Sequence, residues 1–263
     1  RDAYKGAELQ LSYNKTAGDW NFYIAANGLY VTSERLKVDE VWSEDYLYRK
    51  GQPVDATFGL EAIGFFEDDA DIANSPLQSY GTVRPGDLKY KDQNDDGIID
   101  ANDQVYLRRW QTPWSGGLQL KVSYKNLTLF ALGEGRAGAD TFKEGNYYWV
   151  DGNKKYSEVV LEAWTPETKA TATYPRLTSG TNSNNHQRSS FWLYNNDYFN
   201  IRKVQLTYAM PDVVANALLM KKLNLFVDGS ELYQFAKNRK IRDTRVGGEP
   251  YSRTFSIGLK ANF

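Results

Sequence analysis

The residues best suited to chemistry are the acidic and amide side chains between Asp92 and Asp103. Oxygen-bearing side chains occupy positions 1, 3, 5, 9 and 12 of this run, and Gly97 occupies position 6. Hard oxygen ligands at this spacing converge on calcium, the glycine allows the sharp turn, and position 7 offers its backbone carbonyl. The pattern predicts a structural Ca²⁺ site with the ligands Asp92, Asn94, Asp96, Ile98, Asp100 and Asp103.

The context of this run differs from that of a calcium sensor. Asp103 is shorter than the Glu usual at position 12, so we expect it to bind through one oxygen or through water. The flanking segments Leu88–Tyr90 and Gln104–Leu107 predict strands, not the helices of an EF-hand. The site would therefore stiffen a loop. The alternative is a turn that Asp and Asn stabilise without any ion.

Catalytic residue types are scarce. The chain has one histidine, His186, and no cysteine, so it cannot form a histidine-based triad or a thiolate site from ordinary partners. We expect His186 to be a solvated loop residue. Carboxylate pairs such as those near Glu134 suggest a glycosidase only weakly, because 33 acidic residues supply many pairs by chance. The sequence therefore predicts that the chain is not an enzyme.

Composition narrows the class of protein further. Aromatic residues make up 14% of the chain although the mean hydropathy is −0.62, a combination found in membrane β-barrels and in carbohydrate-binding sandwiches. No run approaches the roughly 18 apolar residues of a membrane helix. The formal charge of −1 offers no attraction to nucleic acid. Four loop aromatics could stack on sugars, but we favour a girdle or packing role for Tyr147, Tyr148, Trp149 and Trp192.

Several segments alternate between apolar and polar residues, the period-two pattern of strands with two unlike faces. The alternation covers 18–31, 117–124, 203–210, 222–228 and 251–263. Phe226 interrupts the pattern in the fourth of these. The last segment is long enough for the roughly 9–11 residues of a transmembrane strand and ends on the aromatic Phe263. These features favour a barrel over the edge strand of a soluble sandwich, which would normally be blunted.

The connections between these strands are of two kinds. Lys125-Asn126 is a tight hairpin turn, whereas 34–55, 67–103, 138–190 and 234–250 are long and polar. Bacterial outer-membrane barrels combine short periplasmic turns with long extracellular loops. Within the connections, 156–164 and 211–220 predict short helices.

A series of motifs between residues 51 and 263 resembles the SusC/RagA group of TonB-dependent outer-membrane transporters. In chain order they are Gly51-Gln52-Pro53, Gly64-Phe65-Phe66, Pro85-Gly86-Asp87-Leu88-Lys89-Tyr90, Asp92–Asp100, Tyr124-Lys125-Asn126-Leu127, Trp164-Thr165-Pro166-Glu167, Tyr174-Pro175-Arg176-Leu177, Ser190–Tyr194 and Tyr198–Arg202. The order of the motifs is more specific than any one of them. Phe199-Asn200 departs from the family's usual Leu-Arg at that place.

The resemblance implies an all-β membrane protein in the outer membrane of a Gram-negative cell. Residues 1–263 would form the C-terminal section of an antiparallel transmembrane β-barrel of about 22 strands with long extracellular loops. The first strand-like run begins at Gly6, so we expect the plug and the first strands to lie outside this chain. Oligosaccharides or peptides would be imported with a SusD-like lipoprotein partner, and TonB would act through the absent N-terminal part.

Two other classes of function remain as alternatives. One is a secreted, calcium-stabilised β-sandwich that binds carbohydrate, and the other is an envelope hydrolase. The terminal aromatic strand and the alternating loop lengths favour the transporter over the sandwich. The hydrolase has no nucleophile with a matching base.

Overall fold

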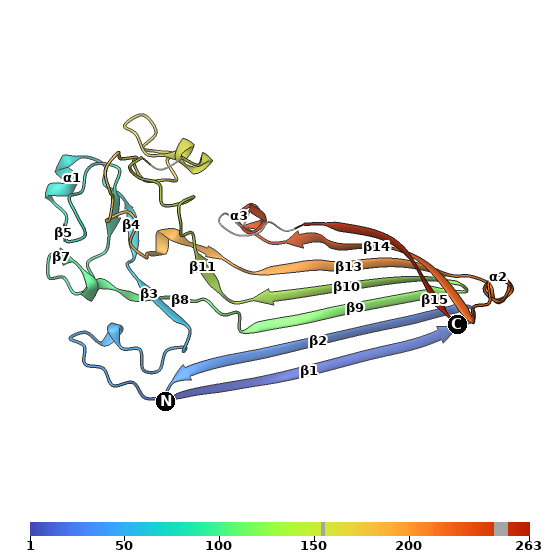
Figure 1. The fold of residues 1–263 in the computed structure, drawn as a ribbon. Helices are drawn as coiled ribbons and strands as arrows, with labels where there is room; N and C mark the ends of the chain where they lie inside the picture. Colours follow the sequence, from blue (N-terminus) through green and yellow to red (C-terminus); the bar gives the residue numbers. More distant parts are fainter. Residues whose placement is uncertain (154–155, 245–251) are drawn as a thin grey trace. The chain divides into compact units, whose positions relative to one another are not determined.

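The computed structural model describes residues 1–153, 156–244 and 252–263, which fall into two compact units (Figure 1). The sheet unit comprises 4–32, 112–139 and 196–263. The loop unit comprises 1–3, 33–111 and 140–195. No helix among these residues is long and apolar enough to cross a membrane.

The sheet unit is built on one seven-stranded sheet whose spatial order follows the chain. Neighbouring strands lie side by side in Figure 1, and the registered pairs are antiparallel. The strands are β1 (Asp2–Ala17), β2 (Trp20–Arg35), β9 (Trp114–Tyr124), β10 (Leu127–Ala137), β13 (Tyr198–Ala209), β14 (Lys222–Phe235) and β15 (Thr254–Asn262). This single meander is the expected arrangement of a barrel wall and differs from the two facing sheets of the alternative sandwich.

Cross-strand register gives the sheet one apolar and one mostly polar face, because alternate residues point to opposite sides. Two adjacent apolar rows run across six strands: Trp20, Tyr124, Leu127, Tyr208, Leu225 and Leu259, then Phe22, Val122, Leu129, Leu206, Val227 and Ile257. The intervening row on the other face begins Asn21, Ser123, Thr128 and Thr207. Many side chains of the apolar rows are exposed, as expected for a wall that faces lipid.

Phe226, which interrupts the sequence pattern, lies on the mostly polar face. It pairs with Gly258 of β15, and a Cβ atom added to that glycine would come within 2.6 Å of the Phe226 ring. The ring therefore covers backbone that the glycine leaves bare. The strand prediction for 222–228 is confirmed, and the exception has a packing cause.

Short and long connections alternate along the sheet, as predicted. β1–β2 and β9–β10 are joined by two-residue turns, and Lys125 adopts the left-handed conformation of such a turn (φ 48°). The long insertions β2–β9 and β10–β13 both leave from the opposite end of the sheet. Hydrogen bonds close their bases, from Val31 N to Pro113 O (2.9 Å) and from Asn196 N to Ala139 O (3.0 Å).

The loop unit contains regular structure that the long polar connections did not predict in full. Its small sheets pair β3 (Ala56–Gly59) with β8 (Val105–Arg109), β4 (Ala62–Phe65) with β6 (Leu88–Tyr90), β5 (Leu77–Gln78) with β7 (Ile98–Ile99), and β11 (Asp140–Phe142) with β12 (Leu193–Asn195). Its short helices are α1 (Asp69–Ala73) and the 3-10 helices η1 (Asp45–Leu47), η2 (Ala101–Asp103), η3 (Glu158–Glu162) and η4 (Ser190–Trp192). A hydrophobic core of Leu60, Leu88, Tyr90, Ile99, Ala163, Tyr174 and Trp192 holds them together.

Both predicted helices are present in shortened form. The segment 156–164 contains η3, and 211–220 contains α2 (Asp212–Ala217). A further helix, α3 (Arg239–Thr244), follows β14. Residues 245–250 of the predicted loop 234–250 and Tyr251 of the last predicted strand lie outside the described residues.

Candidate functional site

The predicted calcium run forms a tight turn in which carboxylates accept hydrogen bonds from backbone amides. Asp92 Oδ2 accepts from Gly97 N and Asp96 Oδ1 accepts from Ile98 N, both at 2.8 Å. Asp103 accepts from the backbone nitrogens of Gln93 and Asp100 at 2.7 Å. The side chains thus hold their own loop, which is the arrangement of the ion-free alternative.

The electrostatics of this turn favour a cation nonetheless. Burial, and then the charges of Asp92 and Asp100, raise the pKa of the Asp103 carboxyl, although its backbone hydrogen bonds oppose the shift. Burial and the same negative field raise the pKa of the nearby Tyr46 hydroxyl to about 12. Tyr46 donates to Asn102 O at 2.7 Å. Asp92 Oδ1 is buried without a hydrogen-bond partner.

The donor set therefore suits a hard cation, but the side chains do not converge as a finished cage. Across the described ranges, no group of three or more His, Cys, Asp or Glu side chains is arranged to hold a metal ion. All six predicted ligands lie in this one turn: Asp92, Asn94, Asp96, Ile98, Asp100 and Asp103.

A second polar cluster surrounds Asp87 at the centre of the loop unit. Asp87 is fully buried, and its carboxylate accepts hydrogen bonds from Arg84 N (2.8 Å), Asn182 Nδ2 (2.9 Å) and Asn185 Nδ2 (2.9 Å). Arg176 Nε lies 2.8 Å from Asp87 Oδ1 in an ion pair, although its N–H is not aimed at the oxygen. One carboxylate therefore ties residues 84–87 to residues 176–185, two regions that are distant in sequence.

Side-chain amides complete the hydrogen bonding of β6 beside this carboxylate. Asn185 Oδ1 accepts from Leu88 N at 2.8 Å, and Asn184 Nδ2 donates to Leu88 O at 2.9 Å. Gln78 donates to the same carbonyl and accepts from Tyr90 N. The amides thus replace a neighbouring strand, because buried backbone groups must be paired.

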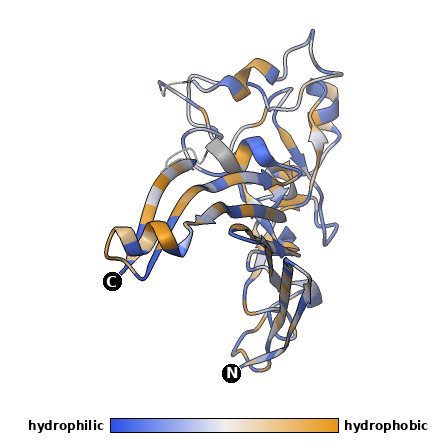
Figure 2. Ribbon diagram, turned by 90° about the vertical axis from the view of Figure 1, so that its right-hand side faces the viewer, coloured by the Kyte–Doolittle hydropathy of each residue, from blue (hydrophilic) through white to orange (hydrophobic). Residues whose placement is uncertain are grey.

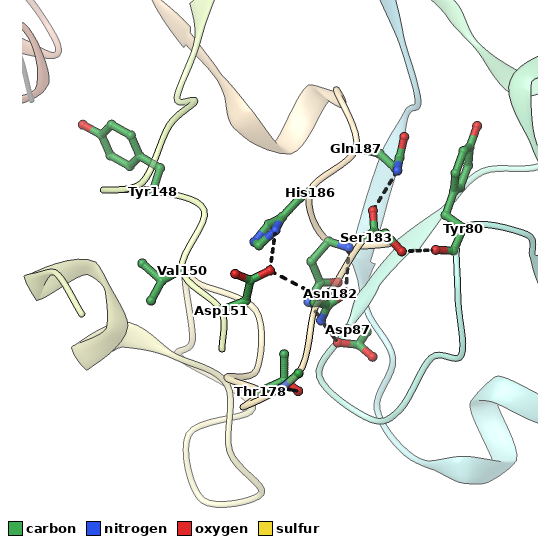
Figure 3. Close-up of polar contacts among 12 residues, drawn as sticks. Tyr80, Asp87, Tyr148, Val150, Asp151, Thr178, Asn182, Ser183, His186 and Gln187 are labelled. Atoms are coloured by element: carbon green, nitrogen blue, oxygen red, sulfur yellow. Dashed lines mark hydrogen bonds and ion pairs between the residues drawn. The ribbon is translucent and has the colours of Figure 1, made fainter. Parts of the chain in front are cut away.

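His186 is packed against this cluster, so the expectation of a solvated loop residue was wrong. Its Nδ1 lies 3.5 Å from Asp151 Oδ2, and that oxygen also accepts from Asn182 N at 3.3 Å (Figure 3). The imidazole stacks on Trp149 with ring centroids 5.4 Å apart, and Trp149 in turn contacts Trp192. The loop aromatics Tyr147, Tyr148, Trp149 and Trp192 make ring contacts within the loop unit. This is the packing role that the sequence analysis favoured over stacking on sugars.

The mostly polar face of the sheet carries a hollow of about 550 Å³. Its charged and amide lining includes Glu8, Gln10, Asn27, Glu134, Arg136 and Arg202. Arg202 is the extra residue of a β-bulge in β13, where it lies 2.8 Å from the Glu231 carboxylate and 3.6 Å from that of Glu134. Glu231 has a left-handed backbone (φ 54°), a strained state that bulges beside functional surfaces often contain.

Sequence reasoning missed this bulge, although a signal was present. The apolar residues of β13 occupy odd positions at Phe199 and Ile201 but even positions at Val204 and Leu206. A one-residue shift in the alternation indicates an inserted residue.

Comparisons with known proteins agree with this geometry. The chain is 26% identical over 232 residues to TonB-dependent receptor P26 of Formosa agariphila, which covers 81% of this chain and 23% of the receptor. It is also similar to the RagAB peptide importer in an open-open state (TM-score 0.72, 19% identity) and to the RagAB peptide transporter (TM-score 0.73, 18% identity). Those matches cover 99% of this chain and 28% and 29% of the solved chains. The chain is thus similar in sequence to part of a TonB-dependent receptor and shares the fold of part of the RagAB structures. No protein-family model matches it.

TonB-dependent receptors are outer-membrane β-barrel proteins and are not enzymes, so the relatives agree with the predicted location and with the predicted lack of an enzymatic role. The antiparallel all-β fold class is confirmed for part of a barrel rather than for a closed one. The chain spans less than a third of the length of each of these relatives. The count of about 22 strands and the assignment of residues 1–263 to the C-terminal section stay predictions.

For the wall of a TonB-dependent receptor, the two faces of the sheet have different surroundings. The apolar rows suit lipid, and the mostly polar face with its hollow suits the lumen. The charged groups around Arg202 lie on the mostly polar face, beside the hollow.

Proposed function

We propose that this chain forms part of the wall and extracellular loops of a TonB-dependent importer of oligosaccharides or peptides. The observation that carries the proposal is the seven-stranded sheet with apolar rows on one face and a polar, hollowed face on the other. The similar solved structures are described as a peptide importer, which favours peptides between the two cargo classes.

The partners follow from the same proposal. A SusD-like surface lipoprotein would deliver cargo to the loop unit, the remaining barrel and plug would complete the channel, and TonB would act from the periplasm. The loop unit has its own hydrophobic core, so it can present a stable surface to such a partner.

Uptake measurements test the importer directly. Cells with the intact gene are expected to accumulate a labelled oligopeptide, and deletion of the gene or of TonB should abolish that uptake. A labelled oligosaccharide of similar mass compares the two cargo classes. Uptake of both cargoes by the deletion strain at the level of the intact strain, or recovery of the protein in the soluble fraction, would contradict the proposal.

We also propose that Ca²⁺ occupies the turn from Asp92 to Asp103. Support comes from the ligand spacing, from the unpartnered Asp92 Oδ1, and from the burial and neighbouring negative charges that together raise the pKa of Tyr46 and Asp103. The ion would be held by the oxygens of the six predicted ligands and would rigidify this extracellular loop.

Calcium removal is expected to loosen this turn. An ion present at 100 times its Kd stabilises the bound state by about 2.7 kcal/mol. Treatment with a calcium chelator should therefore accelerate hydrogen exchange in 92–103 and leave the sheet unit unchanged. In the Asp92→Asn/Asp96→Asn variant the chelator should have no further effect. Exchange that is identical with and without chelator in the unaltered protein would favour the ion-free turn.

A further inference from the structure

The turn between β13 and β14 exposes large apolar side chains on a short helix. Val213 and Leu219 are 80% and 88% exposed, and Leu218 is 51% exposed. Figure 2 shows this helix, beside the C-terminus, coloured mainly as hydrophobic. Exposure of several large apolar residues together in a folded protein usually indicates a contact surface.

Leu219 is present despite an unfavourable backbone conformation. α2 ends in a Schellman motif, with hydrogen bonds from Leu219 N to Asn216 O (3.0 Å) and from Met220 N to Ala215 O (2.9 Å). The residue at this place needs a left-handed backbone, and Leu219 has φ 60°. Glycine, or else asparagine, usually occupies it because a branched side chain is strained there. A leucine at this position gains nothing for the turn, so its side chain must serve a contact outside it.

The burial of Leu223, on the apolar face of β14, indicates that α2 lies on that side of the sheet. The helix packs against β14, and its one fully buried residue is Ala215. In β14, Leu223 is 8% exposed, whereas Leu225 and Val227 of the same apolar face are 43% and 47% exposed. The helix therefore covers the end of the face that the barrel turns toward lipid.

Aromatic residues mark the same end of the sheet. Trp20, Tyr124 and Tyr208 belong to the apolar row nearest the short turns, and the rings of Trp20 and Tyr124 lie 4.5 Å apart. Such girdles lie at the membrane–water interface of outer-membrane barrels, and the short turns face the periplasm. α2 thus begins where the interface is expected.

We propose that α2 and its cap insert Val213, Leu218 and Leu219 into the periplasmic leaflet of the outer membrane. The occupant of this surface is phospholipid at the boundary between headgroups and acyl chains. Continuity with the lipid-facing rows selects lipid over a protein partner, because α2 extends that same face beyond its aromatic row. The inference rests on the proposed membrane barrel.

Site-directed fluorescence quenching tests the insertion in the full-length protein, purified in detergent and reconstituted in phospholipid nanodiscs. Leu219→Cys introduces the attachment site for an environment-sensitive fluorophore into a chain that has no cysteine, and any cysteine elsewhere in the full-length protein is first replaced by serine. Lipids brominated at different depths and aqueous iodide serve as quenchers. We expect the strongest quenching from bromines about 5–10 Å below the headgroups, and a large loss of iodide quenching relative to Asp19→Cys in the β1–β2 turn.

A label introduced by Ile257→Cys lies on the lipid-facing row of β15. It tests the membrane barrel separately from the anchoring of α2. Lipid quenching at 257 with free iodide access at 219 would overturn the anchor while keeping the barrel. Protection of 219 from both quenchers would mean that a protein covers it and would also overturn the anchor. Absence of lipid quenching at position 257 would contradict the membrane barrel itself.

The Leu219→Asn variant gives an independent readout, because asparagine tolerates the left-handed backbone. A purely structural role predicts an unchanged or higher Tm in nanodiscs. The anchor predicts a lower Tm in nanodiscs, and a raised or unchanged value would contradict it.

Discussion

Replacing Asp87 by alanine is expected to destabilise the loop unit by about 3–5 kcal/mol, since removal of one partner of a buried ion pair leaves the other charge uncompensated. The variant would leave the Arg176 charge without its carboxylate partner, and it would remove the acceptor of the Asn182 and Asn185 side chains. Hydrogen exchange at Leu88 and Tyr90, together with limited proteolysis of the detergent-solubilised protein, measures the loss. We expect the sheet unit to keep its protection.

Glu61→Ala is the matched control for this experiment. Its ion pair with Lys91 lies in the same unit at 3.6 Å, but both side chains are exposed. Exposed pairs contribute about 0–1 kcal/mol. A loss of protection in the control as large as that in Asp87→Ala would show that the buried carboxylate has no special role.

Leu206→Arg is expected to destabilise the barrel by about 1–3 kcal/mol, because Leu206 lies one row inward from the interfacial aromatic row, and a basic residue on the lipid face costs about 0–1 kcal/mol near the interface and about 2–4 kcal/mol at the bilayer midplane. Leu206 belongs to the second apolar row, between Leu129 and Val227. The yield of heat-modifiable barrel in the outer membrane, and the Tm in nanodiscs, should both fall.

The adjacent Thr207→Arg variant places the same charge on the opposite face of the same strand. Because that face is polar, we expect a change well below that of Leu206→Arg in both measurements. Equal effects of the two substitutions would mean that the sheet does not separate lipid from a lumen, and the transporter proposal would fail with it.

The sheet could be predicted from sequence because its information is local. Alternation across 117–124 and 203–210 defines both strand and face, and the Lys125-Asn126 turn defines the register between neighbours. Even the exception at Phe226 depends on one cross-strand partner, Gly258. The alternating segments did not cover β1 and β10 or the full lengths of β13 and β14. The β-bulge at Arg202 also escaped, although the shift in alternation marks it.

The loop unit could not be predicted in the same way because its contacts are long-range and made by side chains. Nothing local in Asn184-Asn185 indicates that their amides pair with the backbone of Leu88. The burial of His186 likewise depends on Asp151 and Trp149, from a separate segment. The turn from Asp92 to Asp103 is the opposite case. Its oxygen-bearing side chains were evident from their spacing, whereas their hydrogen bonds to backbone amides were not.

The hydrogen bonds that join the two ends of each long insertion affect how such proteins can diversify. Each insertion starts and ends on hydrogen-bonded neighbours, Val31 with Pro113 and Ala139 with Asn196. The chain between such fixed ends can lengthen at small entropic cost, since doubling a flexible loop adds only about 0.6 kcal/mol. Because the two insertions share one hydrophobic core and the hydrogen bonds of Asp87 to Asn182 and Asn185, they would have to diversify together, while the wall between their bases could be inherited unchanged.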